Sequence, residues 1–174
     1  MAVAASSEFL GYDEFGHEQF NTKRTEVGEL VYRVKYRRDP NALKELVDVV
    51  ARFVKSKNIA ADVIVPVPPT RVRQIQPLFQ IADALGDKLK LPVDKTAVKK
   101  SGTAELKDVW TLEERARILK NAISVDKSAV AGKRVLLIDD LVRSGATINE
   151  VAKQLKAAGV DKLYVVVLTE TRRK

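Results

Sequence analysis

An acidic pair beside a small-residue loop is the arrangement in this chain best suited to chemistry, and it lies in the segment RVLLIDDLVRSGATINEV (residues 134–151). Asp139 and Asp140 follow a short apolar run, residues 135–138, of the kind found in strands buried on both faces of a parallel sheet. Apolar residues then recur at helical spacing over residues 148–158. The segment therefore predicts a strand, a loop and a helix, with both carboxylates where the strand ends.

The loop itself has the composition of an anion site. Ser144, Gly145, Ala146 and Thr147 would lie at the N-terminus of the predicted helix, where unpaired backbone N–H groups and the positive end of the helix dipole face outward. The glycine permits close backbone approach or a positive φ, and the two hydroxyls can donate hydrogen bonds to phosphate oxygens. The carboxylates upstream would repel a bare phosphate, so we expect them to contact neutral hydroxyls or a metal ion. A phosphorylated sugar suits both halves, although an ordinary strand-to-helix corner would use the same residue types.

A second polar loop follows a predicted strand at residues 61–67, in the segment VPVPPTRVRQ. Pro69 stiffens the exit from the strand, while Thr70 and Arg71 supply a hydroxyl and a permanent positive charge. Ligands of open α/β sheets bind at the carboxyl ends of the strands. We therefore expect this loop to face the same ligand as the acidic pair.

Strand and helix alternate along most of the chain, which predicts an α/β fold with a mainly parallel central sheet flanked by helices, in a single domain spanning residues 1–174. Thr25 and Gly159 are candidate caps that help to set the ends of two helices, and Pro40 suits the first turn of another. The expected helices cover residues 25–36, 40–58, 78–89, 111–122 and 148–158, and the expected strands cover residues 61–67, 92–98, 135–138 and 162–170.

Two stretches lack a steady apolar period. Residues 1–24 are expected to be irregular or to form a hood over the site. Residues 99–110 are polar and contain a glycine, so they are expected to form a flexible active-site loop.

Composition narrows the function classes. The chain has no cysteine, which excludes disulfides, zinc ribbons and thiol catalysis and is compatible with a reducing cytoplasm. It shows neither a signal-peptide pattern nor an apolar run long enough to span a bilayer, so we expect a cytoplasmic protein with no membrane partner. The net charge of +8 favours polyanionic ligands. Nucleic acid is one possible partner, but it is not favoured because no nucleic-acid-binding module is recognised and most basic residues are expected on a solvated surface.

The segment VLLIDDLVRSGAT resembles the signature with which type I phosphoribosyltransferases bind 5-phosphoribosyl 1-diphosphate (PRPP). Within that superfamily the chain is most similar to the ComF-like proteins, often called amidophosphoribosyltransferase-like. The likeness rests on GELVYRVKY, VIVPVPPTRVRQIQP and GTAELKDVWTLEERARILKNAISV as well. The resemblance implies the type I phosphoribosyltransferase fold and a homo-oligomer, in the simplest case a dimer.

The resemblance also implies roles for individual residues. Ser144, Gly145, Ala146 and Thr147 would hold the 5-phosphate, while Arg143 joins this loop at a position where other type I enzymes often have a small hydroxylated residue. The carboxylates of the acidic pair would contact the ribose hydroxyls. The turn at Pro69, Thr70 and Arg71 corresponds to the diphosphate loop of the family, and KKSGTAELK (residues 99–107) to its flexible loop.

The expected chemistry explains these residue types. Displacing diphosphate from the anomeric carbon of ribose builds positive charge on the ring and negative charge on the leaving group, so catalysis depends on positioning and electrostatics. Mg²⁺ would bridge diphosphate and ribose oxygens, with Asp139 and Asp140 as protein ligands directly or through water. Arg71 and a loop lysine, Lys107 or else Lys100, would neutralise the departing diphosphate, although Lys107 is equally well explained as a solvated loop residue.

Three functions remain open. The first is a Mg²⁺-dependent enzyme that transfers phosphoribosyl from PRPP to a nitrogen acceptor, an amine or a nucleobase. The second is a PRPP-binding regulator without catalysis, and the third is an accessory protein of competence or DNA metabolism. The sequence favours the enzyme and leaves its acceptor unidentified.

Overall fold

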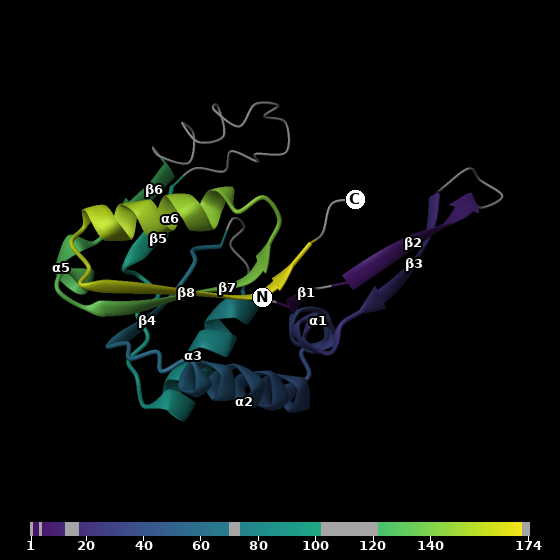
Figure 1. The fold of residues 1–174 in the computed structure, drawn as a ribbon, viewed down its shortest axis with the longest axis horizontal. Coiled ribbons are helices and arrows are strands. Elements are labelled where there is room, and N and C mark those ends of the chain that lie inside the picture. Colours follow the sequence, from purple (N-terminus) through teal and green to yellow (C-terminus); the bar gives the residue numbers. More distant parts are fainter. Residues whose placement is uncertain (1, 4, 13–17, 70–73, 102–121, 172–174) are drawn as a thin grey trace.

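The computed structural model describes residues 2–3, 5–12, 18–69, 74–101 and 122–171, with residues 2–23 described as backbone only. Its centre is a parallel sheet of four strands in the order β1 (Ala2–Val3), β8 (Lys162–Glu170), β7 (Arg134–Val142) and β4 (Val63–Pro66). Figure 1 shows this sheet edge-on, with helices on both sides. The predicted class of fold, a mainly parallel sheet flanked by helices in one domain, is confirmed.

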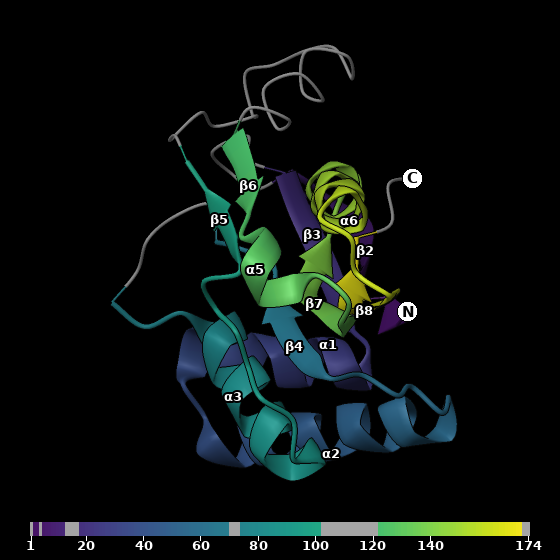
Figure 2. The same cartoon turned by 90° about the vertical axis from the view of Figure 1, so that its left-hand side faces the viewer.

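Helices cover the two faces of the sheet unequally. One face packs against α1 (Glu26–Tyr32), α2 (Pro40–Ser56) and α3 (Pro77–Leu89), and the π-helical turn η1 (Arg33–Arg37) continues α1. The other face packs against α6 (Ala146–Ala157), the short helix α5 (Lys127–Val130) and an antiparallel pair, β5 (Val98–Lys100) and β6 (Ile123–Val125). Figure 2 shows both groups at once, with β4, β7 and β8 between them.

Alternating side chains of β7 supply both cores, as the sequence predicts. Leu136 and Ile138 pack into the core of the α1–α3 side, while Val135 and Leu137 pack into that of the α6 side. All four side chains are 0% exposed. Because burying one such side chain contributes about 1.5–3 kcal/mol, these four residues anchor the acidic pair next to them. The strand predicted at residues 135–138 continues to Val142, so Asp139 and Asp140 lie inside β7 and not where it ends.

Local capping signals set the ends of the helices. The Thr25 hydroxyl accepts a hydrogen bond from the Gly28 N–H at 3.1 Å, and the Asp39 carboxylate accepts from Asn41 and Ala42 at 2.8 and 3.1 Å. Gly159, just beyond α6, has a φ of 86°. The caps predicted at Thr25 and Gly159 are therefore confirmed, and the structure adds Asp39.

The N-terminal segment corrects one prediction. Instead of being irregular, β2 (Ala5–Tyr12) and β3 (Glu18–Arg24) form an antiparallel hairpin that projects beyond α1 in Figure 1. Neither strand shows a steady alternation of apolar and polar residues, so a search for period-two patterns misses them.

The structure also corrects the first residues of the flexible loop predicted at residues 99–110. Lys99 and Lys100 belong to β5 and pair with Ser124 and Ile123 of β6, so these first two residues are strand rather than loop. The rest of that loop and nearly all of the helix predicted at 111–122 lie outside the described residues. Among the helices described, none combines the length and apolarity needed to cross a membrane.

Candidate functional site

The two loops identified in the sequence start at the same edge of the sheet. β4 and β7 run parallel with Pro66 opposite Ile138, and the Val67 N–H donates to the Ile138 carbonyl at 2.9 Å. Pro69 therefore begins its loop beside the part of β7 that follows Ile138, and Asp139 is the first residue of that part. Thr70 and Arg71 lie outside the described residues, so their part in the site stays a prediction.

The small-residue loop at residues 144–147 lies at the start of α6, as the sequence predicts. Gly145 is the N-cap residue of this helix, with φ 75° and ψ −8°, and no side chain caps the first turn. Ser144, Ala146 and Thr147 flank it, so the free N–H groups of the first turn face the loop. A Cβ added to Gly145 would lie 3.3 Å from the Asn149 Nδ2, which is tighter than most such contacts. The loop thus has the geometry of an anion cradle that a side chain would narrow.

Asp139 is a partly buried carboxyl group held next to a second one. Burial and, after it, the charge of the neighbouring Asp140 raise its pKa, and the Asp140 N–H, which donates to Asp139 Oδ1 at 2.9 Å, partly opposes the rise; together these effects bring the pKa to about 7. A carboxyl with this pKa changes its charge near neutral pH. Such perturbed groups are concentrated at functional sites.

A lysine that the sequence reasoning missed contacts Asp140. Lys35 Nζ lies 3.0 Å from Asp140 Oδ2, and the two side chains are only 18% and 16% exposed. Lys35 belongs to the π-helical turn η1, a feature that is rare and often occurs at functional sites. It lies four residues after Val31, on the continuation of the apolar stripe of α1, and that spacing was the available signal. Its charge instead suggested a solvated surface.

Thr169 is a second residue that the sequence reasoning missed. It is 1% exposed in β8, and its hydroxyl donates to the Asp140 carbonyl at 2.6 Å. The bond fixes the backbone of the acidic pair from the neighbouring strand. Threonine is common in buried strands, where it packs like an apolar residue, so nothing in its sequence context indicates the hydrogen bond to Asp140.

The oxygen atoms of the acidic pair are the candidate protein ligands for a magnesium ion. In the part of the chain that the structure describes, no group of three or more His, Cys, Asp and Glu side chains converges. What converges is two adjacent carboxylates, whose mutual repulsion a divalent cation would relieve. Two oxygen ligands suit Mg²⁺, which keeps several waters and takes its other oxygens from a substrate. The site therefore fits a magnesium ion held jointly with a ligand.

The cations predicted to assist the leaving group are only partly described. Lys100 ends β5 on the α6 side of the sheet, and burial lowers the pKa of its ammonium group. Arg143 and Ser144 are exposed in the loop that leads to α6. Lys107 lies outside the described residues, so the choice between the two lysines stays open.

Comparison with known proteins adds three findings. The family model described as phosphoribosyl transferase domain matches residues 36–174. The chain is 32% identical over 131 residues to the transcriptional regulator GfcR of Methanocaldococcus jannaschii, covering 75% of this chain and 54% of that protein. It is 32% identical over 110 residues to competence protein F of Haemophilus influenzae, covering 60% and 48%. The chain thus spans about half the length of each of these relatives.

The fold has close counterparts among solved structures. The adenine phosphoribosyltransferase of Thermoanaerobacter pseudethanolicus superposes with a TM-score of 0.56 at 20% sequence identity, covering 96% of this chain and 83% of that one. At this identity the likeness concerns the fold alone. It agrees with the class of fold described above.

Proposed function

Because this chain belongs to the phosphoribosyl transferase domain family, as a type I member related to competence protein F, we propose that it binds PRPP with Mg²⁺ and transfers the phosphoribosyl group to a nitrogen acceptor, releasing diphosphate. One observation supports this most. The uncapped start of α6, with Gly145 at φ 75°, follows a partly buried acidic pair in the last four residues of β7. A 5-phosphate and two ribose hydroxyls need these two environments side by side.

Different residues bind the 5-phosphate and the ribose of PRPP. Backbone N–H groups of residues 144–147 and the hydroxyls of Ser144 and Thr147 bind the 5-phosphate, with Arg143 adding positive charge. Asp139 and Asp140 accept hydrogen bonds from the ribose hydroxyls. The same two carboxylates would hold Mg²⁺ directly or through water, and when bound the ion would neutralise charge on the diphosphate and ribose oxygens.

The reaction needs charge placement rather than a nucleophilic side chain. As the bond between the anomeric carbon and diphosphate lengthens, the ring becomes positive and the two carboxylates below it stabilise that charge. Lys35 holds the carboxylate of Asp140 in one orientation through its 3.0 Å contact. Arg71 and a loop lysine, Lys107 or Lys100, would meet the negative charge on the leaving diphosphate.

A second function has one observation in its favour. A relative with 32% identity is named a transcriptional regulator, and a protein can use the same PRPP cradle for sensing without catalysis. The two functions predict the same PRPP binding and differ in turnover. Diphosphate release on addition of an acceptor therefore distinguishes them.

The test begins with binding. Isothermal calorimetry with PRPP and Mg²⁺ should give a 1:1 complex for the wild type and a loss of at least about tenfold in affinity for the Asp139→Asn, Asp140→Asn double variant. Asp161→Asn is the matched control, because Asp161 is an exposed aspartate just before the amino end of β8, at the opposite edge of the sheet. Equal affinity in all three proteins would show that the acidic pair is structural.

Turnover is tested next, with diphosphate release measured for purine, pyrimidine and amine acceptors. PRPP binding without release for any acceptor would favour the regulator. The dimer implied by the family resemblance is checked separately by light scattering of the purified chain.

A further inference from the structure

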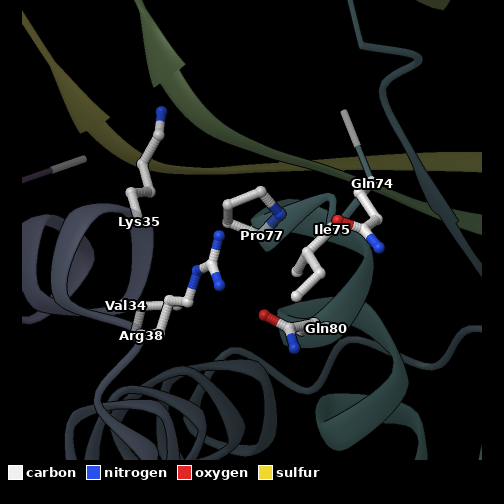
Figure 3. Close-up of a pocket in the computed structure, with 7 residues that line it drawn as sticks. All are labelled: Val34, Lys35, Arg38, Gln74, Ile75, Pro77 and Gln80. Atoms are coloured by element: carbon white, nitrogen blue, oxygen red, sulfur yellow. The ribbon is translucent and has the colours of Figure 1, made fainter. Parts of the chain in front are cut away.

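A small pocket lies beside the acidic pair, on the side of the sheet away from α6. It has a volume of about 110 Å³ and opens between η1 and the start of α3. Its polar lining consists of two cations, Lys35 and Arg38, and two amides, Gln74 and Gln80. Figure 3 shows the Arg38 guanidinium directed from the end of η1 toward the first residues of α3.

The pocket is connected to the acidic pair through one side chain. Lys35 lines the pocket, and its ammonium group is 3.0 Å from the Asp140 carboxylate. The cradle at Gly145 begins α6, which packs on the opposite face of the sheet from α3. A PRPP molecule with its phosphate in the cradle and its ribose over the acidic pair would therefore direct its anomeric end toward the pocket. This step rests on the proposed function.

The lining selects for a particular chemistry. No acidic residue lines the pocket. Arg38 is exposed and has no ion pair with any residue in the described ranges, so its charge is available to an anion. The remaining lining residues, Val34, Ile75 and Pro77, are apolar and would face the carbons of a ring. A diphosphate, which is charged throughout, would leave these apolar surfaces without a partner.

We propose that this pocket is the acceptor subsite and that it selects a single-ring nitrogen acceptor carrying a carboxylate. Arg38 binds the carboxylate, and the amides of Gln74 and Gln80 bind polar atoms of the ring. The volume of about 110 Å³ is below that of a cavity that holds benzene, on the order of 150 Å³, so it excludes a two-ring acceptor and leaves part of a single ring outside the pocket. In the transfer, the lone pair of the ring nitrogen forms the N–C bond at the anomeric carbon while the C–O bond to diphosphate breaks. Diphosphate leaves with that electron pair, and a nitrogen that carries a proton releases it to solvent.

Matched pairs of acceptors test the proposal on the full chain. Nicotinate and nicotinamide share a ring and differ in charge, and orotate differs from uracil by a carboxylate. Calorimetry without PRPP and diphosphate release with PRPP and Mg²⁺ should both favour one acidic member over its neutral partner by about tenfold or more, as expected for one charge-assisted contact. Arg38→Gln should remove this preference. Arg37→Gln is the matched control, because the neighbouring arginine does not line the pocket and its variant should keep the preference.

The other outcomes separate this inference from the proposed function. If PRPP binds normally while acidic and neutral members behave alike, or none binds or reacts, the subsite assignment is overturned and the PRPP site stands. If Arg38→Gln weakens the binding of PRPP or diphosphate more than that of the acid, the pocket belongs to the leaving group and the proposal is wrong. If the wild type does not bind PRPP at all, the proposed function fails and the acceptor subsite fails with it.

Discussion

Replacing Asp139 by asparagine should make the protein more stable at alkaline pH. The carboxyl group is buried beside Asp140, and its pKa rises to about 7, so the folded protein holds a charge there above neutral pH at a cost in free energy. Asparagine has the same shape and no charge, and its carbonyl oxygen can still accept the hydrogen bond from the Asp140 N–H, which is 2.9 Å long in the wild type. The variant thus removes the charge and keeps the contact.

The magnitude follows from proton linkage. Below an unfolded pKa of about 3.9, Asp139 is protonated in both states, and above the folded pKa it is ionised in both. Between these values only the folded state keeps the proton, so the free energy of unfolding of the wild type falls as pH rises, by about 1.4 kcal/mol per pH unit. Across the whole window this amounts to roughly 4 kcal/mol, and across the part above pH 5 to about 3 kcal/mol.

Urea unfolding at pH 5 and pH 8 measures this effect. Groups that do not interact with Asp139 titrate alike in both proteins, so the difference in stability between variant and wild type reports on Asp139 and its coupling to Asp140. The free energy of unfolding of the variant minus that of the wild type should increase by about 3 kcal/mol from pH 5 to pH 8. The cost of burying the asparagine amide is the same at both pH values and does not affect this change. A difference that stays the same at both pH values would show that Asp139 does not hold a raised pKa and would refute the reasoning.

Three further predictions concern single sites. Gly145→Ala should weaken PRPP binding by about tenfold or more in calorimetry, because the new methyl enters the cradle. The control is Gly159→Ala at the other end of α6, where φ is 86° and nothing lies within 4 Å of the added Cβ, so only backbone strain is added. Equal PRPP affinity in the two variants would contradict the cradle. Gly86→Ala should lower the free energy of unfolding by about 1–3 kcal/mol despite better helix propensity, because its Cβ would lie 2.5 Å from Val93 Cγ2; an unchanged Tm would mean that α3 shifts without cost. Asp62→Asn should destabilise the protein at pH 7, because its hydrogen bond with Arg134 holds the pKa of Asp62 at about 2. That stabilisation is present above pH 4 and is lost as pH falls toward 2, so the gap to the wild type in urea unfolding should be clearly smaller at pH 3 than at pH 7. A gap of the same size at both pH values would exclude the ion pair as its cause.

Much of the fold could be predicted because its determinants are local. The caps at Thr25 and Asp39 act on backbone groups two or three residues away. The strand at residues 162–170 and its bounds are confirmed because a continuous apolar run between a turn and a polar end describes a buried strand. The hairpin of β2 and β3 was missed because its strands show no alternating pattern and pair only with each other.

The chain by itself determined the strand, loop and helix that form the candidate cradle, since burial of residues 135–138 and the positive φ of Gly145 follow from residue types within one short segment. Only the tertiary structure decided what surrounds the acidic pair. Lys35 reaches Asp140 because α1 packs across the sheet and ends in a π-helical turn, and Arg38 meets α3 for the same reason. The pKa of Asp139 likewise depends on burial by elements distant in sequence. These contacts arise from how helices dock on a sheet, and that docking is set by the sum of many packed side chains rather than by any local pattern.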